Sequence, residues 1–120
     1  MSHKGYTLNY FIALFESIPD HQWCVGEFQN EGTVQHCALG HARRNLRTTL
    51  EKTSSESWAR SVALGDFFGS EDLVTEINDN EDGEYTSLGK TPRGRILRAL
   101  RNRQRTGNIW GDVDNSSSEE

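Results

Sequence analysis

Apolar residues recur every three or four positions near the start of the chain, which is the spacing of an amphipathic helix. The apolar positions are Leu8, Phe11, Ile12, Phe15 and Ile18. Thr7 is a suitable N-cap, and Pro19 interrupts the pattern because proline cannot continue a helix. The sequence therefore predicts a helix over residues 7–18 that buries one face.

Three more helices are predicted between residues 38 and 77. Thr53 and Glu56 have the spacing of a capping box, Gly69 is a suitable helix end, and Ser70 is a suitable N-cap. The expected ranges are 38–50, 53–69 and 70–77. Each range has apolar residues on one side and polar residues on the other.

The last predicted helix follows a long loop over residues 78–90. Thr91 and Pro92 form the favoured pairing of N-cap and first helical residue. Ile96, Leu97 and Leu100 then provide an apolar side, and arginines line the rest of the helix up to about residue 104. Residues 105–120 end in a polar run and are expected to form a mobile C-terminal tail.

A short β-hairpin is expected between the first and second helices. Residues 22–28 and 33–38 are rich in aromatic and β-branched side chains, and they flank the turn sequence Asn30-Glu31-Gly32. Together these elements predict an α+β fold, a mainly helical single domain with four or five helices packed around one short β-hairpin. Residues 1–104 would form this globular domain.

The composition fits one folded domain flanked by polar segments. The 120 residues are 33% hydrophobic and 26% charged, with a mean hydropathy of −0.76. No apolar run reaches the roughly 18 residues that a membrane-spanning helix needs, and the first residues lack the features of a secretory signal. We therefore expect a cytoplasmic protein without membrane contact. In that reducing compartment the two cysteines would remain thiols, and a structural disulfide is the minority alternative.

The net charge of −5 conceals two blocks of opposite sign. Residues 66–84 are rich in Asp and Glu, with no Lys or Arg between Arg60 and Lys90, and six arginines follow within residues 93–105. The blocks could pair with each other or face different partners. Residues 78–83 superficially resemble a calcium loop, but Glu84 comes too early to be its last ligand, so we expect a solvated acidic loop.

Residues 23–41 hold both cysteines, two of the four histidines and one of the three tryptophans. Cys24, His36, Cys37 and His41 are suitable zinc ligands by type. However, the cysteines are thirteen positions apart, whereas structural zinc sites use closely spaced pairs. We therefore predict no metal and no cofactor.

An enzyme is an alternative interpretation of the same segment. Cys37 would be the nucleophile of a hydrolase or transferase, with His41 as its base, because a helix N-terminus near residue 38 would stabilise a thiolate. The simpler explanation is that residues four apart are neighbours on one helix face. We predict no catalytic residue, and Cys37 and His41 are the candidates if there is one.

The arginine helix is a candidate for contact with phosphate or with a partner. The residues proposed for this contact are Arg93, Arg95, Arg98 and Arg101. A nucleic-acid-binding module through residues 93–105 is therefore a further alternative, although the acidic net charge does not favour nucleic acid. Pairing with the acidic stretch would explain the arginines without any ligand.

Several short motifs follow one another in a characteristic order. They are Trp23-Cys24-Val25-Gly26, Cys37-Ala38-Leu39-Gly40 and Ile77-Asn78-Asp79, with Thr91-Pro92 before the closing helix. This order resembles a family of small uncharacterised bacterial and phage proteins with W-C-x-G, C-A-L-G and I-N-D motifs. The resemblance implies a phage origin and the host cytoplasm as location. Such proteins often bind a host enzyme or sequester a nucleotide signal.

The sequence thus predicts a small non-enzymatic binding or regulatory protein. It would act on a host protein or sequester a nucleotide-like ligand through residues 23–41 and the helix at 93–105, and a homo-oligomer remains open. The binding site would lie at an apolar cleft between the hairpin and the helices, with Trp23, Cys37, His41 and Asn78-Asp79 at its rim. The predicted ligand-binding residues are Trp23, Cys24, His36, Cys37, His41, Asn78 and Asp79.

Overall fold

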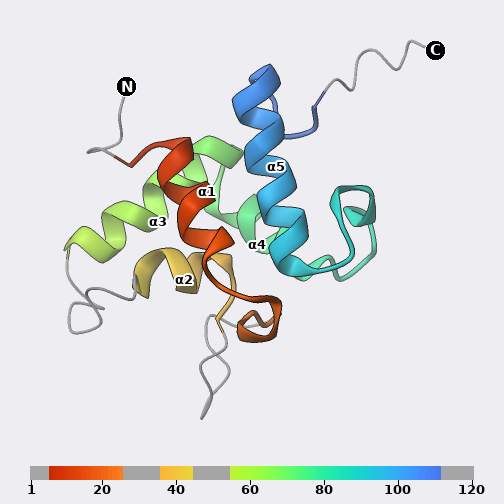
Figure 1. The fold of residues 1–120 in the computed structure, drawn as a ribbon, viewed down its shortest axis with the longest axis horizontal. Helices are drawn as coiled ribbons and strands as arrows, with labels where there is room; N and C mark the ends of the chain where they lie inside the picture. The colour runs from red at the N-terminus through yellow and green to blue at the C-terminus, as the bar shows by residue number, and fades with distance from the viewer. Residues whose placement is uncertain (1–5, 26–35, 45–54, 112–120) are drawn as a thin grey trace.

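The computed structural model describes residues 6–25, 36–44 and 55–111 (Figure 1). Within these ranges the chain forms five α-helices and two short 3-10 helices. The α-helices are α1 (Leu8–Glu16), α2 (Ala38–Arg44), α3 (Ser55–Phe68), α4 (Glu71–Asp79) and α5 (Pro92–Thr106), and the 3-10 helices are η2 (Asp20–Gln22) and η4 (Thr86–Leu88).

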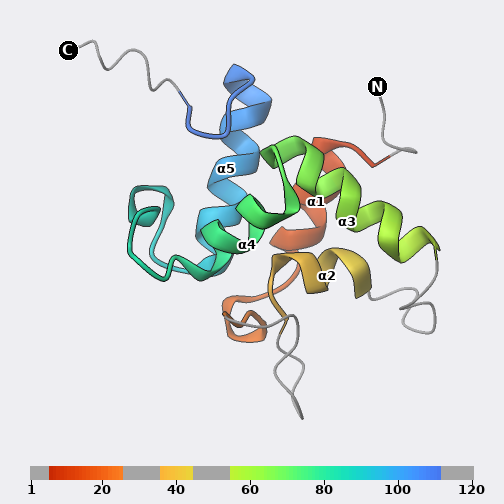
Figure 2. The ribbon, with the colours of Figure 1, turned by 180° about the vertical axis from the view of Figure 1, so that it is seen from behind.

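The helices enclose one core. In Figure 1, α1 lies in front and α4 lies behind it, and the order is reversed in the opposite view of Figure 2. Helix α1 packs against α2 and α5, and α4 packs against α2, α3 and α5. The first and last helices are therefore neighbours in space although they are far apart in sequence.

Aromatic side chains from the first part of the chain form one side of the core. The rings of Phe11 and Phe15 stack at 6.1 Å, and Trp23 meets Phe15 edge-on at 5.3 Å. The buried indole of Trp23 donates its Nε1 hydrogen to the carbonyl oxygen of Ile18 at 3.1 Å. The apolar spacing that predicted the first helix thus reflects real burial.

Three predicted N-caps are confirmed. The hydroxyls of Thr7, Ser70 and Thr91 accept hydrogen bonds from backbone N–H groups three residues later, at 3.0–3.1 Å. These bonds satisfy N–H groups that have no partner within their own helix. The expected capping box at Thr53 and Glu56 lies outside the described residues.

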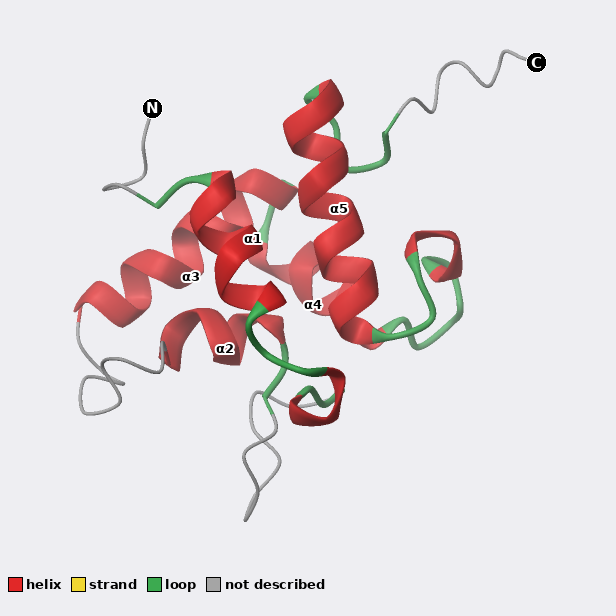
Figure 3. Cartoon of the chain, viewed as in Figure 1, coloured by secondary structure: helices red, strands yellow, loops and turns green. Residues whose placement is uncertain are grey.

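The expected β-hairpin is wrong. Among the residues that the structure describes, the backbone forms helices and loops but no strand (Figure 3). Where the structure describes the two predicted arms, at residues 22–25 and 36–38, they meet in one bridge between Trp23 and His36, and this bridge is parallel. The arms of a tight hairpin run antiparallel, so the bridge belongs to another arrangement. The described part is all-helical rather than α+β, and the predicted turn at 30–32 lies outside it.

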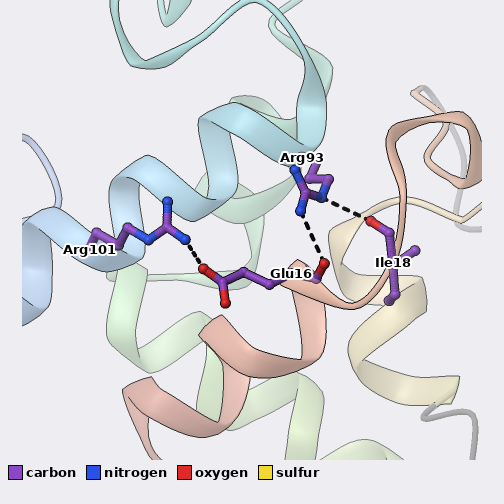
Figure 4. A network of polar contacts seen from close by, with 4 residues as sticks. All are labelled: Glu16, Ile18, Arg93 and Arg101. Atoms are coloured by element: carbon purple, nitrogen blue, oxygen red, sulfur yellow. Dashed lines mark hydrogen bonds and ion pairs between the residues drawn. The ribbon is translucent and has the colours of Figure 1, made fainter.

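Arginine side chains cap the C-terminal ends of four helices. Four arginines donate to backbone carbonyl oxygens in the last turn, or just beyond it, of α2, α1, α4 and α3: these are Arg60, Arg93, Arg95 and Arg103, respectively. The last carbonyls of a helix lack intrahelical partners and carry partial negative charge, so a guanidinium group suits them. Figure 4 shows Arg93 reaching from α5 to the carbonyl oxygens of Glu16 and Ile18.

The end of the described chain packs on α5. Ile109 is buried, and its carbonyl oxygen accepts a hydrogen bond from Asn102 Nδ2 at 2.9 Å. None of the described helices is both long and apolar enough to cross a lipid bilayer.

Candidate binding site

Three predicted site residues meet in the interior. The ring of His41 lies 4.9 Å from that of Trp23 and 5.0 Å from that of His36, measured between centroids. His41 Nε2 is 2.8 Å from the carbonyl oxygen of Gln22, which can only accept, so this nitrogen carries a hydrogen. All three rings are buried. They pack the fold and do not line an open cleft.

Cys37 occupies the N-cap position of α2. Its carbonyl oxygen accepts the hydrogen bond of the His41 backbone N–H at 2.9 Å, and its side chain is 3% exposed. Burial raises the pKa of the Cys37 thiol, and the negative charge of Asp79 adds to the rise. Hydrogen bonds from the N–H groups of Gly40 and Leu39 act in the opposite direction but do not prevail. The helix N-terminus therefore does not produce the activated thiolate that the enzyme alternative requires.

Asn78 connects the two motif segments. Its Oδ1 accepts the N–H of Ala38 at 3.0 Å, and its Nδ2 donates to the carbonyl oxygen of Cys24 at 3.0 Å and to the Asp79 carboxylate at 2.9 Å. In a parallel ladder that continued from the Trp23–His36 bridge, the Ala38 N–H would bond directly to Cys24. The Asn78 amide is inserted at this position. It ends the ladder while satisfying both backbone groups.

The seven predicted ligand-binding residues thus lie close together, but mainly as an internal network. Only half-buried Cys24 and Asp79 are not fully enclosed. Among the described residues, no three His, Cys, Asp or Glu side chains are grouped so that they could hold a metal ion.

The four predicted contact arginines are divided between interior and surface. Arg95 is 4% exposed, which corrects the expectation that the arginines line the outer side of α5. Its guanidinium group donates to the carbonyl oxygens of Ile77 at 2.7 Å and Asn78 at 2.6 Å. Burial lowers the pKa of Arg95, and Asp79 opposes this effect.

The other three contact arginines are more accessible. Arg93 donates to carbonyls at the end of α1, and Arg101 forms an ion pair with the Glu16 carboxylate. Arg98 is exposed. Half of the predicted phosphate contact, Arg93 and Arg95, is thus engaged in capping helices.

A cavity of about 420 Å³ lies between α4 and the loop that follows it. The residues lining it are Thr75, Glu76, Asp79, Glu81, Asp82, Glu84 and Tyr85. Five of these seven are carboxylates. The cavity shares Asp79 with the internal network.

The loop that borders this cavity is held by its own hydrogen bonds. Asn80 ends α4 in the left-handed conformation at φ 49°, and its Oδ1 accepts the backbone N–H of Tyr85 at 2.8 Å. Its Nδ2 donates to Thr86 Oγ1 at 3.1 Å, and Thr86 Oγ1 in turn donates to the carbonyl oxygen of Gly83. The acidic residues are therefore presented by a structured loop, whereas the sequence predicted only a solvated one.

Two aromatic residues extend the acidic cavity. The rings of Tyr85 and Trp110 stack at 5.8 Å with an angle of 16°, and Trp110 is 41% exposed. The Tyr85 hydroxyl donates to Glu76 Oε1 at 3.0 Å. Desolvation, together with the carboxylates of Glu76 and Glu84, raises the pKa of Tyr85. The tyrosine thus stays a neutral hydrogen-bond donor beside the carboxylates.

We call these residues the acidic surface: the five cavity carboxylates with Tyr85 and Trp110. Carboxylates attract cations, and an exposed aromatic face binds guanidinium and ammonium groups. The sequence pattern indicates the acidic block but not the aromatic pair. Tyr85 within the acidic stretch was the available signal, whereas nothing local to Trp110 indicated that it stacks on a residue 25 positions earlier.

Comparisons with known proteins give no match: no protein-family model, no curated protein and no solved structure is similar to this chain. The motif resemblance to phage and bacterial proteins therefore stays a prediction.

Proposed function

We propose that this protein is a small non-enzymatic binding protein that regulates a partner protein by binding a basic segment of it at the acidic surface. The observation that carries the proposal is the stacked Tyr85–Trp110 pair beside a cavity lined by five carboxylates. The volume of about 420 Å³ is in the range of ligand-binding pockets, roughly 300–1,000 Å³.

The chemistry of this surface suits lysine and arginine side chains. Carboxylates provide long-range attraction and charge-assisted hydrogen bonds, which mainly accelerate association and select the partner. Trp110 offers an exposed ring of the kind that contributes strongly to binding at protein interfaces.

A nucleotide-like ligand is less compatible with the same geometry. Phosphate groups would meet the repulsion of the cavity carboxylates, and the guanidinium groups of Arg93 and Arg95 already donate to backbone carbonyls. For the same reason we do not propose the nucleic-acid module. The hydrolase or transferase alternative is not proposed because Cys37 is buried with a raised pKa.

A host protein as partner, and a phage origin, would follow from the motif resemblance alone. The acidic surface itself requires only a basic partner segment in the same compartment. The regulated activity would then belong to that partner.

A binding experiment tests the proposal with a defined probe. A short fluorescent oligoarginine peptide is titrated with the wild-type protein and with Glu81→Gln/Glu84→Gln, a variant that removes two exposed cavity carboxylates. We expect the variant to bind roughly tenfold more weakly or worse, and binding of the wild type to weaken as salt rises.

The matched control is Asp20→Asn/Asp72→Asn, which removes two exposed carboxylates that do not line the cavity. It makes the same change in net charge and should bind the peptide within about twofold of the wild type if the cavity is the site. Equal losses in both variants would reduce the effect to net charge and contradict the proposal. ADP binding as tightly as the peptide would favour the nucleotide alternative instead.

A further inference from the structure

The parallel bridge between Trp23 and His36 fixes the positions of the two cysteines relative to each other. The backbone N–H of His36 donates to Gln22 at 3.0 Å, and the N–H of Cys24 donates to His36 at 3.0 Å. In parallel register, the residues after a bridged pair also face each other. Cys24 therefore faces Cys37, although the two are thirteen positions apart in the sequence.

The side chains of Cys24 and Cys37 also point to the same side of the two paired segments. The rings of Trp23 and His36 both approach His41 on one side. Successive side chains of an extended chain point to opposite sides, so Cys24 and Cys37 both point to the other side. The Asn78 amide lies between the two backbones at this point, bonded to the carbonyl oxygen of Cys24 and to the N–H that follows Cys37.

A disulfide can bridge the spacing of a regular ladder. Neighbouring chains in a ladder lie about 4.8 Å apart, and disulfides join residues whose Cα atoms are about 4.4–6.8 Å apart. Directly after the bridged pair, the Asn78 amide ties the two backbones together through its bonds to Cys24 and Ala38. Neither cysteine is in a disulfide in this structure.

We propose that Cys24 and Cys37 are a redox-modification site, at which they form a reversible intramolecular disulfide by exchange with a small-molecule disulfide. The thiolate of half-buried Cys24 attacks one sulfur of the small disulfide, whose S–S bond breaks and releases one thiolate. The thiolate of buried Cys37 then attacks Cys24 Sγ, which breaks the mixed disulfide and releases the second thiolate. The two protons lost by the cysteines protonate the released thiolates. The pair is oxidised, and the small disulfide is reduced to two thiols.

This site is independent of the proposed function, since it needs no partner. The order of attack follows from exposure: Cys24 is half-buried and can meet a solute, whereas Cys37 is only 3% exposed. The proposed bond differs from a structural disulfide, because the protein is already folded with both cysteines as free thiols.

The experiment equilibrates the whole protein with mixtures of reduced and oxidised glutathione, with and without urea. After acid quenching and alkylation, intact mass and peptide mapping measure the fraction that contains a Cys24–Cys37 bond. We expect an effective thiol concentration roughly tenfold or more higher in the native protein than in urea, because the native fold holds the pair together.

Controls are the single variants Cys24→Ser and Cys37→Ser. Cys37→Ser should stop at the mixed disulfide of Cys24 with glutathione, and Cys24→Ser should react slowly because only the buried thiol remains. Three results would overturn the proposal: a stable mixed disulfide on the wild-type protein, covalent dimers as the main product, or a native effective concentration no higher than that in urea. The wild-type comparison stands even if a variant fails to fold.

Discussion

The Asn78 side chain takes the place of a backbone hydrogen bond between two segments of the chain. It is completely buried, and its amide uses both its oxygen and its nitrogen on groups from distant parts of the chain. An aspartate has the same size but cannot donate. At this position it would also place a second negative charge beside Asp79.

We expect Asn78→Asp to destabilise the protein by roughly 2–4 kcal/mol at neutral pH, because the carbonyl of Cys24 loses its donor and a carboxylate is buried. Urea denaturation followed by circular dichroism measures the change. The same substitution at exposed Asn9 is the control and should change stability by less than about 0.5 kcal/mol. Similar losses at both positions would contradict the role given to Asn78.

The Cys37 thiol predicts a loss of stability in alkaline solution. Its pKa in the folded protein is raised above the ordinary value of 9.0, so the fold favours the protonated thiol. In the unfolded chain the thiol ionises near pH 9, while in the folded chain it does not. The stabilisation is therefore complete below pH 9 and is lost as pH rises toward the raised value.

Comparison with Cys37→Ala isolates this effect, because other groups that titrate in alkali are common to both proteins. Between pH 7 and pH 10 the free energy of unfolding should fall more steeply for the wild type than for Cys37→Ala. Parallel curves would mean that the thiol ionises equally in both states. In either case the native Cys37 should react with iodoacetamide much more slowly than Cys24.

At the scale of elements, local signals predicted the helices well. Thr7, Ser70 and Thr91 cap helices where the sequence placed them, because an N-cap bond joins residues only three apart. The hairpin failed for the opposite reason. Its arms have strand-like composition, but the amide of Asn78, 40 positions beyond Ala38, takes the next position in the ladder, and helix α2 begins at once.

Arg95 was likewise assigned to the wrong side of its helix. Sequence periodicity treats a charged residue as solvent-exposed, whereas the open carbonyls at the end of α4 provide an interior partner. Such pairings depend on which helix ends meet, and that information is not local. The position of the cavity carboxylates beside Trp110 was unpredictable for the same reason.

We expect Arg95→Lys to lower the free energy of unfolding by roughly 2–3 kcal/mol, since an ammonium group cannot reproduce the planar fork that reaches the carbonyls of Ile77, Asn78 and Gly89. Chemical denaturation measures the loss, and amide hydrogen exchange should show it first in the last turn of α4. Arg98→Lys on the exposed side of α5 is the matched control and should be nearly neutral. Equal stability of both variants would show that charge alone suffices at Arg95.

At the scale of the whole molecule, two arginines join α1 and α5, and we expect them to contribute unequally to stability. Arg93 donates to the carbonyl oxygens of Glu16 and Ile18, each at 3.0 Å, whereas Arg101 pairs with the Glu16 carboxylate at the surface (Figure 4). The side chains of this ion pair are 50% and 45% exposed, so water and salt weaken their attraction.

Arg93→Ala should therefore cost about 1–2 kcal/mol, because it leaves the end of α1 without its cap. Arg101→Ala should cost less than about 1 kcal/mol, and added salt should reduce the difference from wild type further. Thermal and urea denaturation at low and high salt distinguish the two. A larger loss for Arg101 would reverse the assignment of which contact holds the helices together.

The pairing of α1 with α5 determines when the nascent chain can fold during synthesis. The ribosome synthesises α1 early. Because α1 packs against α5, Phe11 and Phe15 cannot be fully buried until α5 has emerged from the exit tunnel. Nascent chains stalled before residue 92 should consequently remain sensitive to protease. Resistance should arise abruptly once α5 has emerged and Arg93 can donate to the carbonyl oxygens of Glu16 and Ile18.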